Sequence, residues 1–229
     1  MNGVRFLENL RRLFKELRNM YRAIKLDKEY LKRLDPSFEV SYQYRFHAGF
    51  RSLKLYRLSH AFYVSGFKFI AYFIYHINRV LYTVDIHPAA VLEPGVVIDH
   101  GAGVVVGSTA IVGSGTVLYH GVTLGAKYIT KGKRHPTVGK NVIIGAGAKV
   151  LGPVNIGDNA KIGANSVVIS DIPDNATAVG IPARIVNKNY RDDEKLSVSF
   201  SSYTDKKEKS ERSDDLCPEE LVNLEVAKQ

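Results

Sequence analysis

Bulky aliphatic residues recur every six positions between Val84 and Val186. This spacing is neither the 3.6-residue period of an α-helix nor the two-residue alternation of an ordinary strand. Small residues follow the aliphatic positions at fixed offsets, as in Ile156-Gly-Asp-Asn-Ala. A six-residue period kept over this whole stretch predicts a parallel β-helix in which each hexad forms one side of a coil. The aliphatic positions are Ile86, Leu92, Ile98, Val106, Val112, Leu118, Leu124, Val138, Ile144, Val150, Ile156, Ile162 and Val168.

The repeat is interrupted twice. Between Ile98 and Val106 the step is eight residues instead of six, and His100 lies in this slip. Between Leu124 and Val138 the step is fourteen, two more than two hexads, and the segment is polar and contains glycine. Such excursions from a rigid scaffold commonly project as loops, and loops of this kind carry function. We therefore expect the functional residues at the two interruptions.

The residues before the repeat have the spacing of α-helices. Residues 1 to about 34 combine apolar positions at helical spacing with many Lys and Arg, which predicts a basic amphipathic helix. That helix either packs on a neighbouring element or attaches to an anionic membrane surface. Two further helices, over Phe46–Val64 and from Gly66 to about Tyr82, are expected to cover the terminal hydrophobic face of the coils.

The composition changes abruptly to Lys, Glu, Asp and Ser beyond Val186. A segment of this kind cannot bury enough apolar surface to fold, so residues 188–229 are predicted to form a disordered tail. We expect a helical region over 1–82 and a β-helix over 83–187. The fold class is therefore α+β, and mainly β.

The net charge of +9 suits nucleic acid, a membrane surface or a polyanionic small ligand. No nucleic-acid motif is present, which favours a phosphate-rich cofactor and argues against nucleic acid. The single cysteine, Cys217, excludes an internal disulfide framework. The first thirty residues are heavily charged and lack the apolar core of a secretory signal, so we expect a cytoplasmic protein.

Several motifs within and around the two interruptions resemble those of serine O-acetyltransferases. These hexapeptide-repeat enzymes transfer acetyl from acetyl-CoA to L-serine on the way to cysteine. The resemblance covers the whole repeat and, more weakly, the two helices before it, and it implies a left-handed β-helix in a homotrimer or a dimer of trimers, with sites between subunits. The motifs are Asp85-Ile-His-Pro-Ala, Ile98-Asp-His-Gly, Gly121-Val-Thr-Leu-Gly, Lys133-Arg-His-Pro and Gly180-Ile-Pro-Ala-Arg.

Transfer of an acyl group to a hydroxyl needs a base, because an alcohol is a poor nucleophile at neutral pH until its proton is removed. His100 is the candidate base. The resemblance matches Asp85 to the carboxylate that orients it. If each hexad forms one side of a coil, residues 80–85 and 98–103 lie on the same face one coil apart, so we expect the two side chains to approach each other.

The substrate amino acid presents a carboxylate and an ammonium group. Arg134 is suited to a bidentate grip on the carboxylate, and the resemblance assigns it that role, with His135 beside it. The resemblance also implies that Asp99 binds the ammonium group. A second aspartate with this role, from an Asp-Pro ahead of the helices, matches Asp35.

Acetyl-CoA is the co-substrate that the resemblance implies, and no metal is expected. Small residues that let the pantetheine arm lie close match Gly125, Ala146 and Ala164. Lys133 and Arg184 are candidates for contacts with the nucleotide phosphates.

Two other functions keep parts of this pattern. An acetyltransferase that modifies sugar hydroxyls in surface-polysaccharide synthesis would retain His100 and Asp85 without the amino-acid clamp, and Ser108, at a position where the family has glutamate, favours it mildly. A non-catalytic β-helix scaffold would have lost the histidine. Members of the family end in an isoleucine that docks into the sulfhydrylase. The sequence here ends in Gln229 instead, so we do not expect that complex.

Overall fold

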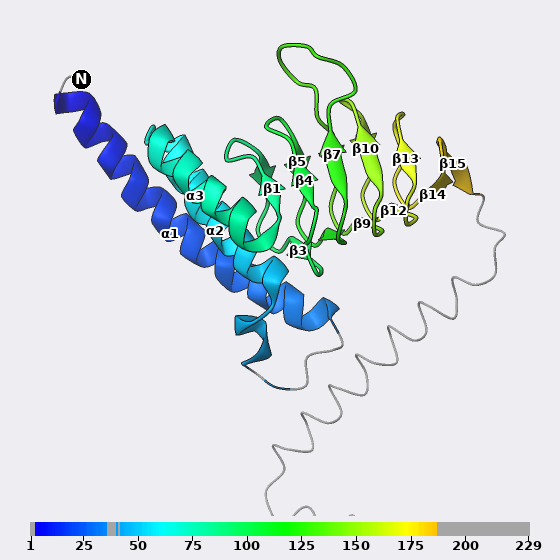
Figure 1. Cartoon of the computed structure of the whole chain (residues 1–229), viewed down its shortest axis with the longest axis horizontal. Coiled ribbons are helices and arrows are strands. Elements are labelled where there is room, and N and C mark those ends of the chain that lie inside the picture. Colours follow the sequence, from blue (N-terminus) through cyan, green and yellow to red (C-terminus); the bar gives the residue numbers. More distant parts are fainter. Residues whose placement is uncertain (1–2, 36–39, 41, 187–229) are drawn as a thin grey trace, which may run out of the picture. The chain divides into compact units, whose positions relative to one another are not determined.

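A stack of short strands follows three α-helices in the computed structural model, which describes residues 3–35, 40 and 42–186 (Figure 1). The helices are α1 (Gly3–Leu34), α2 (Ala48–Val64) and α3 (Lys68–Tyr82), and the 3₁₀-helix η1 (Gln43–Arg45) lies ahead of α2. The expected tail over 188–229, including Cys217, lies outside the described residues.

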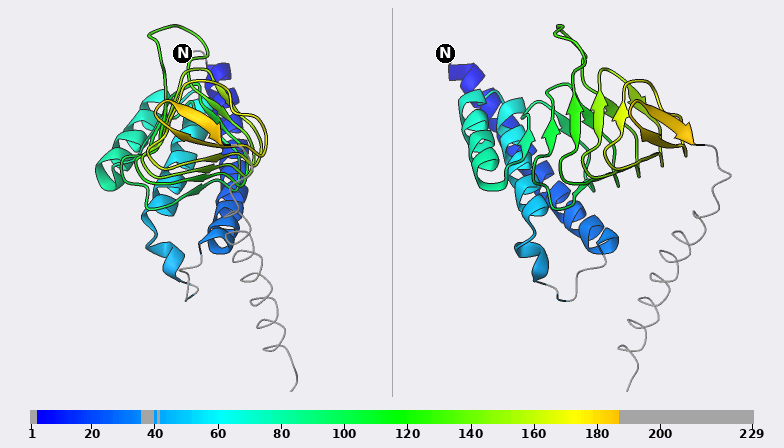
Figure 2. Two further views of the ribbon diagram at one scale, coloured as in Figure 1. Left: turned by 90° about the vertical axis from the view of Figure 1, so that its right-hand side faces the viewer. Right: turned by 45° about the vertical axis from the view of Figure 1, so that its right-hand side comes forward.

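The strands wind into coils with three sides, and each side is a sheet made of one strand per coil. Figure 2 shows the coils stacked one behind another. The first sheet has the order β1-β4-β7-β10-β13, the second β11-β8-β5-β2 and the third β15-β14-β12-β9-β6-β3. The strands are β1 (Asp85–Ile86), β2 (Val91–Leu92), β3 (Val97–Ile98), β4 (Val105–Val106), β5 (Ile111–Val112), β6 (Val117–Leu118), β7 (Thr123–Gly125), β8 (Thr137–Val138), β9 (Ile143–Ile144), β10 (Lys149–Leu151), β11 (Asn155–Ile156), β12 (Lys161–Ile162), β13 (Val167–Val168), β14 (Thr177–Gly180) and β15 (Ala183–Val186).

The thirteen aliphatic positions of the repeat form the core of the coils. Each is at most 4% exposed, and each pairs in register with its counterpart in the next coil, as Ile86 does with Val106 and Val106 with Leu124. Burial of these side chains is the main force that holds the coils together. The predicted fold class, a mainly β left-handed parallel β-helix preceded by helices, is confirmed.

The fourteen-residue step between Leu124 and Val138 is not two hexads with two extra residues. It joins β7 of the first sheet to β8 of the second, so it is a single side of a coil with eight residues inserted. Figure 1 shows the inserted loop standing out from the coils. The end of the repeat also differs, because β14 continues the third sheet and β15 returns antiparallel to it.

The helices cover the first coil. Leu53 and Tyr56 of α2 enter the core of the coils, and the Tyr56 hydroxyl donates to the carbonyl of Ala90. Arg57 donates to the carboxylate of Asp27 in α1 at 2.9 Å and to the carbonyl of Leu92 at 2.5 Å, so one guanidinium joins both helices to the coils. None of the described helices is long and apolar enough to span a bilayer.

Candidate functional site

The eight-residue step places His100 at the edge where the third sheet meets the first, directly after β3. Its φ of 58° lies in the left-handed region, which is uncommon for a residue with a side chain, and the N–H of Gly101 bonds the carbonyl of Asp99 across it. The His100 side chain is 74% exposed, so the ring is accessible to a ligand. Backbone in such a region is a common mark of functional positions.

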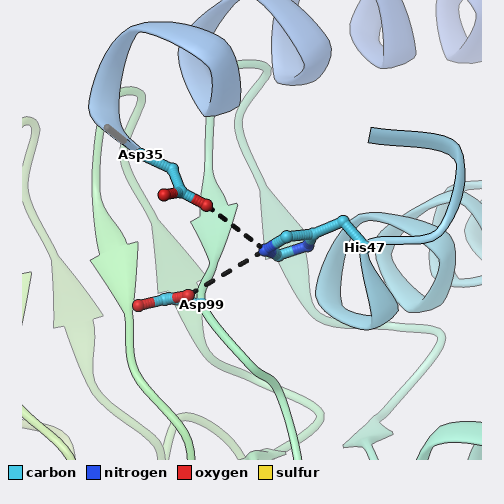
Figure 3. Close-up of side chains that lie close together, drawn as sticks. All are labelled: Asp35, His47 and Asp99. Carbon is cyan, nitrogen blue, oxygen red and sulfur yellow. Dashed lines mark ion pairs between the residues drawn. The ribbon is translucent and has the colours of Figure 1, made fainter. Parts of the chain in front are cut away.

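Three side chains from distant parts of the sequence converge beside His100 (Figure 3). Asp35 follows the last residue of α1, His47 precedes α2, and Asp99 follows β3. His47 Nε2 lies 3.8 Å from Asp35 Oδ2 and 3.9 Å from Asp99 Oδ1, and Asp99 Oδ1 lies 3.8 Å from His100 Nε2. The nearby His47 is the largest cause that holds the pKa of Asp99 below its usual value, with a further contribution from His100. The two aspartates assigned to the ammonium group are therefore neighbours.

Ala146 and Ala164 lie along the same edge of the coils as His100. The N–H of Gly147 bonds the carbonyl of His120, and the N–H of Asn165 bonds the carbonyl of Ala146, so His120, Ala146 and Ala164 take equivalent places in successive coils. The His120 ring packs edge-on against the His100 ring, with the centroids 5.8 Å apart. Two small residues thus continue the edge that begins at His100, and leave room there for an extended ligand such as a pantetheine arm. We call this the His100 edge.

Asp85 is not bonded to His100. The expectation that residues 80–85 and 98–103 share one face is wrong, because Asp85 opens β1 of the first sheet and pairs with Val105, whereas β3 belongs to the third sheet. The Asp85 carboxylate accepts a hydrogen bond from the Tyr75 hydroxyl and lies 3.4 Å from Arg79 Nε. Burial and this bond to Asp85 raise the pKa of Tyr75 to about 12, so the phenol stays protonated as a donor. The pairing of Asp85 with His100 stays a prediction.

His135 lies at the root of the inserted loop and is anchored by Thr109. The Thr109 hydroxyl oxygen accepts from the backbone N–H groups of Arg134 and His135, each at 3.1 Å, and it lies 2.8 Å from His135 Nδ1. Because Nδ1 also accepts from the N–H of Thr109, the imidazole proton resides on Nε2. Burial, followed by the charges of Arg134 and Lys133, lowers the pKa of His135, so the ring is neutral.

Arg134 and Lys133 are held at the same root. Arg134 donates to the carbonyl of Thr130 at 3.2 Å, and the Lys133 ammonium donates to the carbonyl of Thr109 at 2.7 Å. The charge of Arg134 also lowers the pKa of His87, after burial, which places His87 in its electrostatic range. We call this corner, where the first sheet meets the second, the Arg134 edge.

The His100 edge and the Arg134 edge lie on opposite sides of the first sheet. Gly101 and Gly107 are six positions apart, and at ~3.3 Å per residue a fully extended chain of this length would span at most roughly 20 Å. Figure 1 shows β3 below the coils and the inserted loop above them. One chain therefore separates the residues predicted for the ammonium group from those predicted for the carboxylate.

The remaining predicted cofactor residues do not share one place. Gly125 ends β7, beside the inserted loop, and Arg184 lies exposed in β15 at the end of the coils. His47, Thr109 and Tyr75 contact the predicted site residues and were not predicted from the sequence. Thr109 had a signal, because it follows Gly107-Ser108 in the coil next to the inserted loop, while His47 and Tyr75 had none beyond their places on predicted helices.

The comparisons with known proteins agree with these motifs. Residues 135–170 match the bacterial transferase hexapeptide family (six repeats). A serine acetyltransferase from Helicobacter pylori is 48% identical over 141 residues, which make up 62% of this chain and 82% of the relative. This chain belongs to the serine acetyltransferase family. The serine acetyltransferase of Bacillus subtilis is 41% identical over 173 residues, or 74% of this chain and 78% of that relative.

Solved structures of the family match the fold as well. The serine acetyltransferase of Neisseria gonorrhoeae in complex with serine is 39% identical, with a TM-score of 0.72 over 76% of this chain and 72% of that one. A serine acetyltransferase in complex with CoA is 38% identical, with a TM-score of 0.71 over 78% of this chain and 75% of that one. The family read from the sequence is confirmed, and the chain is an acyltransferase that uses acetyl-CoA.

Proposed function

We propose that this chain transfers acetyl from acetyl-CoA to the hydroxyl of L-serine, with His100 as the general base. The observation that carries the proposal is the convergence of Asp35 and Asp99 beside an exposed histidine, on a scaffold of the serine acetyltransferase family. A sugar hydroxyl would not need paired carboxylates, whereas an amino acid brings an ammonium group that two carboxylates are suited to hold.

The reaction follows from the position of His100. Its Nε2 removes the proton from the serine hydroxyl as the oxygen attacks the thioester carbonyl carbon, and a C–O bond forms. When the tetrahedral intermediate collapses, the C–S bond breaks, and the imidazolium returns the proton to the leaving sulfur. The products are O-acetyl-L-serine and CoA. No protein nucleophile takes part, so a ternary complex is required. The neighbouring Asp99 carboxylate favours the imidazolium as it forms.

The carboxylate of serine is assigned to Arg134. The guanidinium can form a bidentate pair, and the neutral His135 beside it supplies its Nε2 hydrogen as a further donor. These two residues lie on the edge opposite His100, so a single chain does not bring them to the same serine. We therefore place each site between two copies, with the His100 edge of one chain facing the Arg134 edge of its neighbour, as in a closed homotrimer.

Acetyl-CoA fits the same placement. Ala146 and Ala164 supply a lane of small side chains leading to His100, and Gly125 and Lys133 line the Arg134 edge of the neighbouring copy. Arg184, in the last hairpin, is the candidate for the far end of the nucleotide. The single cysteine of the chain and the use of acetyl-CoA both suit the reducing cytoplasm. We propose that the protein works there.

The decisive experiment measures thiol release from acetyl-CoA by the full chain, with L-serine compared against a panel of sugars. We expect saturable thiol release with serine and only background hydrolysis with the sugars. Release with a sugar and not with serine would overturn the proposal.

A further inference from the structure

The two ring nitrogens of His47 have different partners. Nδ1 accepts a hydrogen bond of 3.2 Å from the backbone N–H of Phe50, so the side chain caps the first turn of α2. An acceptor nitrogen carries a lone pair and no hydrogen. The cap therefore assigns the ring hydrogen to Nε2.

That Nε2–H faces both carboxylates of the proposed ammonium site. It lies 3.8 Å from Asp35 Oδ2 and 3.9 Å from Asp99 Oδ1, and all three side chains are largely shielded from solvent (Figure 3). Both distances exceed the ~2.9 Å of a direct N–H···O bond, so the N–H acts on both carboxylates at once and not on one alone. The ring sits between two aspartates that come from α1 and from the slip after β3.

Two neighbouring carboxylates repel each other, and such a pair tends to take up a proton. A proton on either aspartate would remove a charge that the substrate ammonium needs. A donor placed between the carboxylates opposes this, and the pKa of Asp99 is indeed lowered, with His47 as the largest cause.

We propose that His47 is a positioning residue for the substrate ammonium, a donor whose Nε2–H holds Asp35 and Asp99 ionised and at a fixed separation. The inference rests on the proposed function, because it assigns a role within the same serine site. His47 itself does not touch the reacting atoms. Its contribution is to affinity for serine, and turnover at saturating serine is left nearly unchanged.

A divalent metal ion is another ligand that two carboxylates and a histidine suggest, since their ligand atoms lie within 4.8 Å of one another. A metal bound to Nε2 would take the lone pair there and put the hydrogen on Nδ1. That hydrogen would then meet the N–H of Phe50, and the cap would be lost. The cap thus favours a donor at Nε2 over a metal ligand.

Two substitutions separate the two roles of the ring, which are the cap of α2 through Nδ1 and the donation to the aspartates through Nε2. In His47→Asn the side-chain oxygen takes the place of Nδ1 and keeps the cap, because asparagine is a favoured N-cap residue, but nothing reaches the aspartates. In His47→Gln the side-chain amide nitrogen extends as far as Nε2 does, so a donor to the two aspartates is kept, while the cap of α2 is weakened. The experiment measures the KM values for serine and acetyl-CoA, kcat and Tm for the full chain and both variants.

We expect His47→Asn to raise the serine KM about tenfold, the loss typical of a hydrogen bond to a charged group, with the acetyl-CoA KM and Tm unchanged. We expect His47→Gln to keep the serine KM within about threefold of the unsubstituted chain and to lower Tm by roughly 2–4 °C, as the loss of a cap does. A serine KM that rises in His47→Gln, where the cap is weakened, and not in His47→Asn, where the cap is kept, would overturn the inference. A stoichiometric Zn²⁺ complex of the unsubstituted chain in calorimetry, lost in both variants, would also overturn it.

The inference and the function on which it rests fail differently. An unsubstituted chain that shows no serine-dependent thiol release would overturn both. An unsubstituted chain that acetylates serine, with His47→Asn at the same serine KM, would overturn the inference alone.

Discussion

Gly49 of α2 packs directly on the carbonyl of Ile98 in β3. A methyl group added at Gly49 would come within 2.0 Å of that oxygen, and one added at Gly101 would come within 3.3 Å of Gly49 Cα. The contact brings the start of α2, with His47, against the slip that carries Asp99 and His100. A glycine two residues into a helix, where propensity disfavours it, thus has a packing reason.

Gly49→Ala is expected to move α2 away from the slip. Overpacking of this kind typically costs about 1–3 kcal/mol of unfolding free energy, and separation of His47 from Asp99 should raise the serine KM several-fold. Urea unfolding and steady-state kinetics measure the two effects. Ala48→Gly is the matched control, because it weakens the same helical turn without adding bulk. A serine KM unchanged in Gly49→Ala would contradict this role for the contact.

His100→Ala should lower kcat by about 10²–10⁴-fold, the range for loss of a general base, with little change in Tm, because the ring is exposed. His76→Ala, an exposed histidine of α3, is the control and should retain full activity. Turnover in His100→Ala close to that of the control would rule out the base.

The shared site predicts complementation. His100→Ala and Arg134→Ala chains should each be impaired, the second mainly through a raised serine KM. When the two are coexpressed in equal amounts, about a quarter of the sites in randomly mixed cyclic oligomers pair an intact His100 edge with an intact Arg134 edge. At serine concentrations well below the KM of the Arg134→Ala chain, activity of the mixture should therefore exceed that of either variant alone. A mixture no more active than its components would place both residues in a site within one chain.

Arg57→Ala should be strongly destabilising. Asp27 and Arg57 are 1% and 7% exposed, and removal of the arginine leaves a buried carboxylate without its partner, which typically costs about 3–5 kcal/mol. Calorimetry or urea unfolding measures the loss. Lys54→Ala, an exposed residue one turn earlier in α2, should change the unfolding free energy by less than about 0.5 kcal/mol. Similar effects for both would show that the buried pair has no special weight.

Because His60 is shielded from solvent, we expect the unfolding free energy to depend on pH. Burial lowers the pKa of His60 in the folded chain, so as pH falls below the ordinary value near 6.5 the unfolded chain takes up the proton first. The unfolding free energy should be highest above about pH 7 and should fall as the pH is lowered from there toward 5. His60→Gln should reduce that slope in urea titrations at several pH values, and an unchanged slope would contradict the assignment.

The six-residue period predicted the coils because it reports which side chains face the core, and all thirteen predicted positions are buried. Strand β14 of the third sheet escaped it, since Ala178 stands where other coils carry a bulky residue. The period also could not show that the fourteen-residue step spans one side, because a loop of any length leaves the register of later coils unchanged.

The site was predicted only in part. His100, Asp99 and Arg134 were predicted for the site because they lie in the interruptions, and Asp35 was matched by its motif. The approach of His47 to Asp35 depends on how α1 and α2 pack against the slip, which no local pattern encodes. The partners of Asp85 came from α3 for the same reason.

Thr109 holds the returning arm of the inserted loop at a fixed point, with its hydroxyl bound by Arg134 and His135 and its carbonyl by Lys133. The carbonyl of Thr130 is the other contact that holds Arg134, and Tyr128 and Ile129 lie exposed ahead of it. Insertions at Tyr128 or Ile129 would therefore leave Arg134 aimed as before. Related chains are free to diverge in length there, and the tip of the loop is the place where a fluorophore or affinity tag can be added without disturbing the chemistry.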